Sequence, residues 1–293
     1  MIRVCINGAV LEPEGAKVSA LDYGFLYGFG LFETLRAYKG KPFALKEHLE
    51  RMEGAAREIG WDFPWDLRTV REWVSLTIEP FGEVDLRLRL TATPGRGEPI
   101  ADPSTCREPT LVIIASELPR DFDRRIERGL KVVLFPHPRG SFASRLKSLS
   151  YIESVLARSF AREKKAHEAL FVNHRGIVTE GATSNVFVIL EGALLTPPPE
   201  LELLDGITRK FVISLALEMG LRVREEEFGP DAFHRCEGAF LTNSVMEVAP
   251  ILSFEGRSLP QSPLVPQLRK AYREMVLSRV GSELPHRGLE FTP

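Results

Sequence analysis

The order of the apolar segments along the chain is the feature that most constrains its fold. Short runs typical of strands and longer helical patterns are mixed, without the regular strand–helix–strand alternation that a doubly wound parallel sheet requires. The strand-like runs are IRVCI, LFETLRAY, DLRLRLTA, TLVIIA, KVVLF, EALFVN, GIVTE, SNVFVIL, ALLTP and GAFLT. We therefore predict an α+β protein.

Local patterns add detail to this prediction. Residues 2–11 favour a hairpin, because Asn7-Gly8 between two apolar runs suits a tight turn with positive φ. In DLRLRLTA, leucines alternate with polar residues, as in a half-buried strand. Apolar residues at helical spacing predict four helices. These helices cover residues 44–60, 65–79, 207–219 and 264–280, and a further one is expected to begin at about Lys147.

A change in composition suggests where the chain divides. The 293 residues suit one large domain or two ordinary ones. Residues 117–129, ELPRDFDRRIERG, are dense in charge and poor in apolar residues, which is typical of a solvated connector. We predict a smaller N-terminal α/β domain at 1–118, a connector at 119–130 and a larger C-terminal domain at 131–293.

Charge and cysteine content exclude several classes of protein. The net charge is −2, with 38 Lys and Arg against 40 Asp and Glu, so no strong field favours nucleic acid or an anionic membrane. The three cysteines, Cys5, Cys106 and Cys236, show neither a disulfide framework nor metal-ligand spacing. The first residues lack the pattern of a secretory leader. We expect a cytoplasmic protein without a metal.

One lysine lies where a polypeptide can hold a reactive amine. The stretch GSFASRLKSLSYIESVLAR, residues 140–158, places Lys147 between an irregular polar segment and a helical pattern, with small residues around it. Most lysines are solvated surface charges, so this position alone does not distinguish the two interpretations.

Two helical segments contain candidate anion donors. In LLDGITRK, Gly206 and Thr208 stand at the start of a helix, where free backbone N–H groups and a hydroxyl can bind an anion. The alternative is an ordinary helix cap made by Thr208. In KEHLERM, His48 and Arg51 are three residues apart on one helical face, and Arg51 could bind a phosphate. The alternative is a solvated helix face.

Two strand ends contain further candidates. In TEGATSNVFVI, Glu180 ends a strand and small residues follow, which allows a flat ligand to approach the backbone. In FLTNSVMEVAP, Thr242, Asn243 and Ser244 form a polar cluster after an apolar strand. The alternatives are a surface carboxylate beside a hairpin turn and an ordinary turn, respectively.

Together these groups match one cofactor better than any other. An amine nucleophile, a carboxylate and several anion donors are required by a ligand with an aldehyde, a basic ring nitrogen and a phosphate, and pyridoxal 5'-phosphate is such a ligand. A nucleotide fits poorly, because neither phosphate-binding glycine motif appears on a strand–helix turn. The glycine-rich YGFGLF is not followed by a helical pattern.

The chain resembles the class IV aminotransferases, the fold-type IV pyridoxal-phosphate enzymes. The resemblance runs in order along nearly the whole sequence. It covers FLYGFGLFETLR, EHLER, RLKSLSYIESVLAR, EALFVNHRGIVTEGATSNVF, LLDGITR and TNSVMEVAPI. It implies the fold-type IV architecture, in which a smaller N-terminal α/β domain is joined to a larger domain with a β-barrel-like core.

The resemblance also implies roles for particular residues. Lys147 would anchor the cofactor covalently and then act as the base, which requires a lowered pKa. Glu180 would pair with the pyridine nitrogen, and Tyr151 would donate to the phenolic oxygen, as in some members. The phosphate would be bound by Arg51, Ile207, Thr208 and Ser244.

Within the family, the chain is most similar to aminodeoxychorismate lyases. The similarity lies in the FET segment, in RLKS, in LDG-TR and in TNSV-E, and Thr34 stands where branched-chain transaminases have glycine. Phe29 and Ser150 depart from residues common in the family. A transaminase for branched-chain or D-amino acids remains the alternative within the family, and a non-catalytic binder of a phosphorylated metabolite is the alternative outside it.

The substrate side is expected to use cations and aromatic rings. Substrate carboxylates need positive partners, and for each candidate arginine a surface position is an equally good interpretation. The candidates for the substrate site are Tyr27, Phe32, Thr34, Arg89, Arg96 and Asn243, with Arg145 beside the lysine. By analogy with the family we expect a homodimer.

Overall fold

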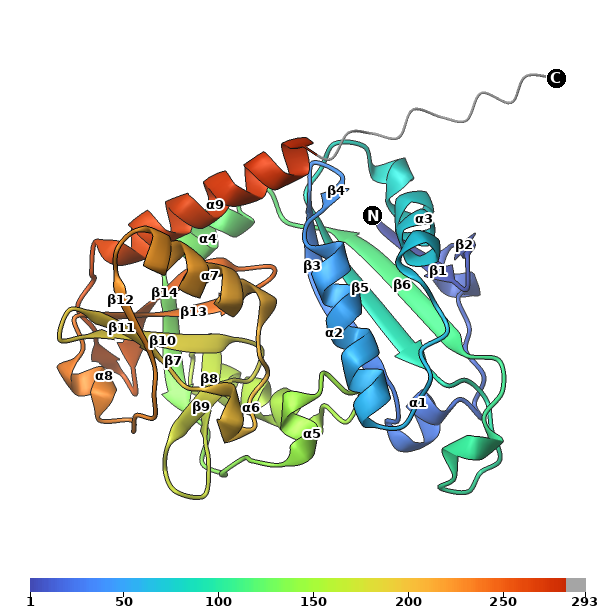
Figure 1. The fold of residues 1–293 in the computed structure, drawn as a ribbon, viewed down its shortest axis with the longest axis horizontal. Helices are drawn as coiled ribbons and strands as arrows, with labels where there is room; N and C mark the ends of the chain where they lie inside the picture. Colours follow the sequence, from blue (N-terminus) through green and yellow to red (C-terminus); the bar gives the residue numbers. More distant parts are fainter. Residues whose placement is uncertain (283–293) are drawn as a thin grey trace.

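The computed structural model describes residues 1–282 and contains two β-sheets, which lie side by side (Figure 1). The first sheet has six antiparallel strands in the order β2-β1-β6-β5-β3-β4. Their bounds are β1 Ile2–Ile6, β2 Ala9–Leu11, β3 Leu31–Tyr38, β4 Lys41–Pro42, β5 Leu86–Thr93 and β6 Thr110–Glu117. The predicted hairpin is confirmed, because Asn7 and Gly8 both have positive φ between paired β1 and β2.

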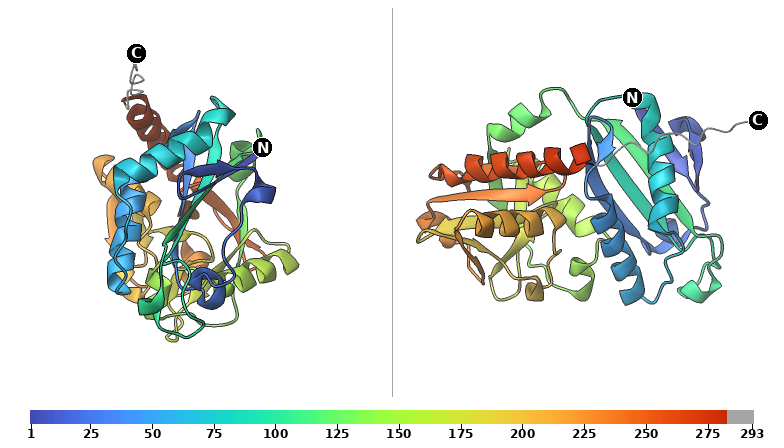
Figure 2. Two further views of the ribbon diagram at one scale, coloured as in Figure 1. Left: turned by 90° about the vertical axis from the view of Figure 1, so that its right-hand side faces the viewer. Right: turned by 45° about the horizontal axis from the view of Figure 1, so that its top comes forward.

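Two helices cover one face of the first sheet (Figure 2). Helix α2, Leu45–Glu58, and helix α3, Leu67–Ile78, bury their apolar faces against alternate residues of β3, β5 and β6. Leu35 and Leu88 face this core because side chains alternate along a strand. The opposite face therefore presents the intervening positions, including Thr34 and Arg89, which are paired across β3 and β5.

The second sheet has nine strands and mixes parallel with antiparallel pairs. Its main path runs β12-β11-β10-β13-β14-β7-β8-β9, and β15 pairs with β14. β7 is parallel to both β14 and β8, and β12 is parallel to β11. The bounds are β7 Leu130–Leu134, β8 Glu168–Val172, β9 Val178–Gly181, β10 Asn185–Leu190, β11 Ala193–Thr196, β12 Arg222–Glu225, β13 Gly238–Asn243, β14 Glu247–Phe254 and β15 Arg257–Ser258.

Helices surround this sheet and meet the first one. Helix α7, Ile207–Glu218, and helix α9, Leu264–Ser282, pack together over strands β10, β13 and β14. The last turns of α9 reach β4, where the Lys41 amine donates to the Val280 carbonyl at 3.2 Å. Helix α6, Ile152–Glu163, packs against β7 and β8. The remaining short helices are α1 Tyr23–Tyr27, α5 Phe142–Arg145 and α8 Ala232–Arg235.

The segment predicted as a solvated connector contains a helix. Helix α4, Phe122–Glu127, lies between β6 and β7, and its Ile126 is buried in the core of the second sheet. The chain passes from the first sheet to the second in this segment. The division into domains at 1–118 and 131–293, with a connector at 119–130, stays our prediction.

Two further differences concern local structure. Lys147 does not begin a helix, because α6 starts five residues later at Ile152 and Lys147 lies in a turn just before Ser148, which forms an isolated bridge with Leu31. Strands β4, β12, β14 and β15 are not among the predicted strands. The other long helices and strands lie within a few residues of their predicted positions.

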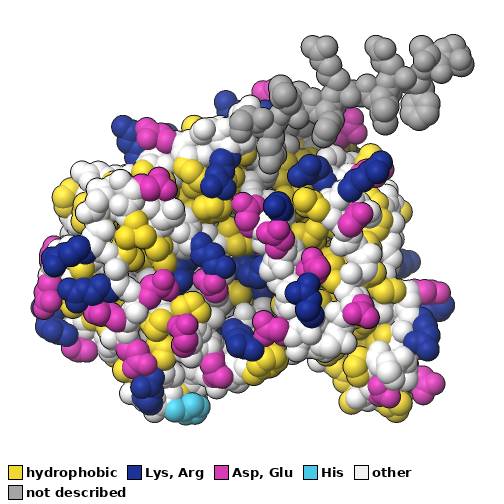
Figure 3. Space-filling view, in the orientation of Figure 1, with side chains coloured by type: hydrophobic (Ala, Val, Ile, Leu, Met, Phe, Trp, Pro, Cys, Tyr) yellow, Lys and Arg dark blue, Asp and Glu magenta, His cyan; other side chains and the backbone are white. Residues whose placement is uncertain are grey.

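The surface shows acidic and basic side chains interspersed, without a broad area of one sign on the face drawn in Figure 3. No helix in the described part of the chain is both long enough and apolar enough to span a bilayer.

Candidate active site

A cavity of about 460 Å³ lies between the two sheets. Strands β3 and β5 supply one wall, and the end of β9, the start of α7 and the turn between β13 and β14 supply the other. Residues far apart in the sequence thus converge on one space. The predicted site residues that line it are Phe32, Thr34, Arg51, Arg89, Lys147, Tyr151, Glu180, Ile207, Thr208, Asn243 and Ser244.

Lys147 is fixed by backbone pairing with the first sheet. Its carbonyl accepts a 2.8 Å hydrogen bond from the Phe32 amide, and the Leu149 amide donates to the Gly30 carbonyl at 2.9 Å. The Lys147 amine lies 4.8 Å from the centre of the Phe32 ring. Burial, and then the nearby Arg51 cation, lower the pKa of Lys147 to about 8. A substantial fraction of this amine is therefore neutral near pH 8.

Glu180 provides a buried carboxylate at the end of β9. One oxygen accepts from the Leu204 amide at 3.1 Å, and the other lies 3.6 Å from an Arg139 guanidinium nitrogen. Burial raises the pKa of Glu180 to about 7, against the opposing effect of Arg139. A cation placed beside this carboxylate would keep it ionised, because opposite charge lowers the pKa of an acid.

The start of α7 forms an anion-binding corner. Gly206 is the N-cap and contributes no side-chain cap, so the Thr208 cap considered from the sequence is not formed. The Thr208 hydroxyl instead lies 3.5 Å from that of Tyr272. A side chain at Gly206 would meet the Asn185 amide oxygen at 2.0 Å, which explains the glycine. Gly206, Ile207 and Thr208 all line the cavity.

Arg51 and Ser244 are held near this corner by a buried carboxylate. Glu33 binds Arg51 through two hydrogen bonds of 2.8 and 2.7 Å and accepts one of 2.7 Å from His48. Burial would raise the pKa of Glu33, but Arg51 and His48 outweigh it and hold that pKa well below its usual range. His48 Nε2 lies 3.2 Å from the Ser244 hydroxyl. Arg51 also donates to the Asp205 carbonyl at 3.1 Å.

Burial also lowers the pKa of His48, against the opposing effect of Glu33, so its neutral form is favoured. A neutral imidazole that donates to Glu33 from Nδ1 can accept a hydrogen bond at Nε2. The Ser244 hydroxyl is then the donor. His48 and Glu33 thus orient two candidate phosphate ligands at once.

The wall opposite Glu180 combines aromatic rings with arginines. The Arg89 guanidinium lies 3.9 Å above the Phe32 ring, and the Tyr151 ring meets Phe32 edge-on at 5.0 Å. Arg87, two residues earlier on the same face of β5, is exposed and also lines the cavity. Among residues 1–282, no carboxylate forms an ion pair with Arg87 or Arg89. Burial, and then the Arg87 charge, lower the pKa of Arg89.

Two predicted substrate residues lie outside this cavity lining. Tyr27 is 42% exposed on α1, where its ring packs against Tyr23. Arg96 is exposed and pairs with Glu108 at 2.8 Å. Arg145 likewise pairs with Glu58 at 2.8 Å near the surface.

Two other predicted residues have defined partners at the cavity. The Tyr151 hydroxyl donates to the Ala182 carbonyl at 2.9 Å. The Asn243 amide donates to the Thr183 carbonyl at 3.1 Å, and its oxygen accepts from the amides of Val245 and Met246.

Sequence reasoning missed several residues that shape the site. Glu33 carried a signal, since a charged residue inside the apolar run LFETLRAY must be exposed or paired. Arg87 shares its alternating pattern with Arg89. Arg139 and Asn185 carried no local signal, because their partners are distant in the sequence. In the described residues, no group of three His, Cys, Asp or Glu side chains is placed to hold a metal ion.

The model of the amino-transferase class IV family matches residues 30–254. This chain belongs to the class IV aminotransferases. The predicted family is thereby confirmed, and the enzymes of this family depend on pyridoxal 5'-phosphate. The prediction of a pyridoxal-phosphate enzyme of the lyase or aminotransferase type is likewise confirmed.

Relatives of this class IV aminotransferase carry different names. It is 35% identical over 259 residues to a Methanocaldococcus jannaschii protein named "Putative branched-chain-amino-acid aminotransferase", with 87% of this chain and 89% of the relative covered. It is 31% identical over 255 residues to the Bacillus subtilis "Aminodeoxychorismate lyase", with 86% of each chain covered.

A solved structure of similar fold is the branched-chain aminotransferase of Thermoproteus uzoniensis with norvaline. The TM-score is 0.87 at 30% identity, and the match covers 96% of this chain and 95% of that one. The predicted fold-type IV architecture is confirmed.

The side chains of the cavity fit the cofactor of this class IV aminotransferase. The uncapped start of α7 with Arg51 and Ser244 provides donors for a phosphate, Glu180 provides an anion for a ring nitrogen, and Lys147 provides an amine. These three chemistries are the ones that the aldehyde, ring and phosphate of pyridoxal phosphate require.

Proposed function

We propose that this enzyme is a 4-amino-4-deoxychorismate lyase, which releases 4-aminobenzoate and pyruvate for folate biosynthesis in the cytoplasm. The observation that carries the proposal is the pair of arginines, Arg87 and Arg89, that line the cavity without a carboxylate partner in the described chain. Aminodeoxychorismate carries two carboxylates, one on the ring and one on the enolpyruvyl group. A branched-chain amino acid has one carboxylate and a hydrocarbon side chain, so one of the two arginines would have no carboxylate to bind.

Residues of the cavity wall support the same proposal. Thr34 lies beside Arg89 in the β3–β5 pairing, where a glycine would leave more room for an aliphatic substrate. Phe32 offers a ring against which a cyclohexadiene can pack. The TNSVME segment, which supplies Asn243 and Ser244, is another feature shared with the lyase branch.

Each reacting residue has a defined task in this proposal. When bound, pyridoxal phosphate supplies a conjugated, electron-withdrawing system that delocalises the negative charge left by a departing proton. The Lys147 amine, a substantial fraction of which is neutral near pH 8, accepts that proton from the ring carbon that bears the substrate nitrogen. Glu180 keeps the ring nitrogen of the cofactor protonated. Arg51, Ile207, Thr208 and Ser244 would hold the phosphate, and Tyr151 would donate to the phenolic oxygen once its hydroxyl turns away from the Ala182 carbonyl.

The overall reaction then needs no second substrate. Loss of the ring proton and departure of the enolpyruvyl group make the ring aromatic, and the departing group takes up a proton and becomes pyruvate. The atoms of aminodeoxychorismate are fully accounted for by 4-aminobenzoate and pyruvate. Arg87 and Arg89 would hold the two carboxylates while this occurs.

A transaminase is the second candidate, and the comparisons supply the observation that favours it. The relative with 35% identity and the structure with a TM-score of 0.87 both bear branched-chain aminotransferase names. Proton abstraction by Lys147 would serve either reaction. A transaminase acting on branched-chain or D-amino acids stalls after one half-reaction unless a keto acid is present.

The two candidates are separated by incubating the enzyme with aminodeoxychorismate in the absence of any keto acid. A lyase produces fluorescent 4-aminobenzoate over many turnovers, and pyruvate appears in equal amount. A transaminase yields at most one product molecule per site under these conditions, and continuous turnover would require 2-oxoglutarate with an amino acid donor.

We also propose a homodimer. Large apolar side chains are exposed on α1 and α6, namely Phe25, Ile152, Val155 and Leu156, with exposed fractions of 75, 70, 56 and 53%. The end of α1 approaches the segment that leads into α6, because a side chain at Gly28 would meet the Ser150 hydroxyl at 3.2 Å. A patch of this kind is typical of a subunit interface.

Light scattering should give twice the chain mass. The variant Ile152→Glu/Val155→Glu should shift the enzyme towards monomer, because charges would be buried at the interface. A monomeric wild-type enzyme with full activity would contradict the dimer. Phe29 and Ser150, the two departures from the family pattern, lie next to this patch, where Ser150 Oγ is 3.4 Å from the Gly28 carbonyl oxygen.

A further inference from the structure

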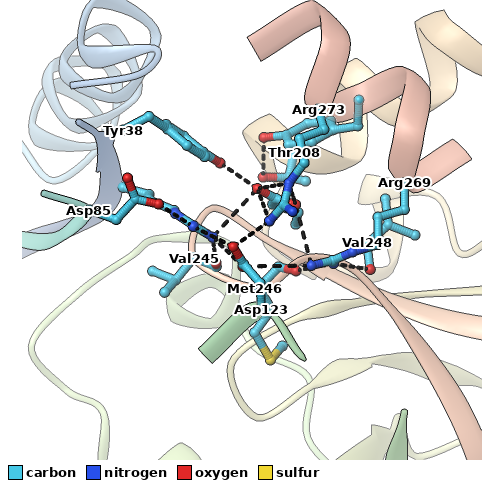
Figure 4. A network of polar contacts seen from close by, with 12 residues as sticks. Tyr38, Asp85, Asp123, Thr208, Val245, Met246, Val248, Arg269 and Arg273 are labelled. Atoms are coloured by element: carbon cyan, nitrogen blue, oxygen red, sulfur yellow. Dashed lines mark hydrogen bonds and ion pairs between the residues drawn. The ribbon is translucent and has the colours of Figure 1, made fainter. Parts of the chain in front are cut away.

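A partly buried group of charged side chains lies beside the turn that carries Val245 and Met246 (Figure 4). We call it the ion cluster. It comes from β3, the residue before β5, α4, the start of β14 and α9. Its members are Arg36, Asp85, Asp123, Glu247, Arg269 and Arg273.

Three arginines of the ion cluster converge on one fully buried carboxylate. Glu247 lies 3.5 Å from Arg36, 3.5 Å from Arg269 and 3.2 Å from Arg273, and it accepts a hydrogen bond of 3.0 Å from the Tyr38 hydroxyl. Burial of so many charges stabilises a protein little unless the geometry is complete. A contribution to the stability of the fold therefore does not explain the ion cluster.

Asp123 of α4 links these arginines. Its two oxygens accept hydrogen bonds of 2.8 and 2.9 Å from Arg36, and it binds Arg273 at 2.6 Å. It also lies 3.7 Å from Arg269. Figure 4 shows Asp123 beneath Arg269 and Arg273, with Tyr38 and Asp85 on the opposite side of the cluster. One carboxylate of the connector thus contacts every arginine of the ion cluster.

The arginines in turn hold the backbone of the cavity turn. Arg36 donates to the Val245 carbonyl at 3.4 Å, and Arg269 donates to the carbonyls of Met246 and Val248 at 3.0 and 2.6 Å. Val245 and Met246 line the cavity together with Ser244. Fixing a carbonyl fixes its whole peptide plane, because the peptide bond does not rotate freely.

The backbone at Glu247 needs such support. Its φ is +62°, in the left-handed region that a residue with a side chain rarely adopts. Conformations of this kind persist where the surrounding contacts determine them. The carboxylate of Glu247 receives those contacts from the three arginines.

We propose that Asp123 is a positioning residue for the reaction. Through Arg36 and Arg269 it sets the turn at residues 243–247, and with it Ser244 and Asn243. The inference rests on the proposed role of Ser244 in holding the cofactor phosphate. Asp123 lies on α4 in the connector, outside both sheets, and the proposal gives it a function in the active site.

The test compares Asp123→Asn with Asp121→Asn. Asp121 lies on the same segment, but its ion pair is with Arg125 at the surface. For each variant the affinity of the apoenzyme for pyridoxal phosphate is measured by absorbance titration, and kcat and KM by steady-state kinetics. We expect Asp123→Asn to weaken cofactor binding about fivefold and to raise KM by a similar factor, within the range known for coupled networks. We expect kcat to change less than about twofold, and Asp121→Asn to match the wild type.

A second variant separates positioning from loss of structure. Asp123→Glu keeps the carboxylate and should recover most of the cofactor affinity. If Asp123→Asn lowers the melting temperature but leaves cofactor affinity and KM unchanged, or if Asp121→Asn has the same effects, Asp123 is merely structural and the proposal is wrong. The cofactor titration is independent of the lyase assignment, so failure of either proposal is recognised separately.

Discussion

The Phe32 amide donates a 2.8 Å hydrogen bond to the carbonyl of Lys147. The side chains of the two residues are also close, because the Lys147 amine lies 4.8 Å from the centre of the Phe32 ring. The candidate reactive lysine is thus attached to the first sheet, although it follows the first strand of the second. Lys147 lines the same cavity as Glu180 and the start of α7. Its position therefore depends on both sheets together.

Replacement of Lys147 by alanine should reduce turnover to the background rate, because both the covalent anchor and the base are lost. Pyridoxal phosphate should still bind, since the phosphate donors remain, but borohydride should no longer fix it to the protein. Lys46→Ala, on the exposed face of α2 where Lys46 pairs with Glu50, is the control. Near-normal turnover by Lys147→Ala would remove this lysine from the mechanism.

The apoenzyme should become more stable when Lys147 is replaced by methionine. The pKa of Lys147 is about 8 in the folded state, whereas a solvated lysine has a pKa of ~10.4. The folded state therefore binds this proton more weakly than the unfolded state, and the penalty is complete below pH 8. Lys147→Met should gain on the order of 2 kcal/mol at pH 7.

This gain should shrink as the pH rises from 8 to ~10.4, because the unfolded chain then loses its proton too. Urea denaturation of the apoenzyme at pH 7 and pH 10 measures the difference, with Lys46→Met as the exposed control. An equal gain at both pH values would show that the effect arises from packing and not from charge.

Glu180→Gln should preserve the fold and lower kcat by roughly 10²- to 10³-fold, because an uncharged ring nitrogen is a weaker electron sink. Glu153→Gln is a matched control, since Glu153 lies 3.4 Å from the same Arg139 but is exposed and does not line the cavity. The observation that would count against this role is an unchanged kcat in Glu180→Gln with normal cofactor content.

Several of these features could be predicted from the sequence because they are local. Helical spacing placed α2, and Asn7-Gly8 placed the first hairpin. The motif order around Lys147 and Glu180 pointed to the family and its cofactor. Strong short-range patterns and short motifs carry this information without knowledge of the tertiary structure.

The remaining features depend on contacts between distant segments. The placement of Lys147 comes from backbone pairing of its segment with β3, which lies more than a hundred residues earlier. The partners of Arg36 lie on α4 and β14, and nothing near Arg36 in the sequence indicates them. Glu247 adopts a left-handed φ that its residue type does not favour, so tertiary contacts must impose it.

Arg87→Gln and Arg89→Gln should each raise KM for aminodeoxychorismate about 10- to 100-fold, because each removes a charge-assisted contact with a carboxylate. The double variant should be worse than either one. Arg96→Gln serves as the control, since Arg96 is exposed and paired with Glu108. If Arg96→Gln raises KM and the other two variants do not, the substrate carboxylates bind elsewhere.

The central claim, lyase activity, is tested most directly by the yield of product per active site without a keto acid. Enzyme with its full content of pyridoxal phosphate is mixed with a thousandfold excess of aminodeoxychorismate, and 4-aminobenzoate and pyruvate are followed together. We predict that both accumulate at a one-to-one ratio far beyond one per site. Failure to form either product, combined with sustained turnover of branched-chain or D-amino acids with 2-oxoglutarate, would contradict the lyase assignment and identify a transaminase.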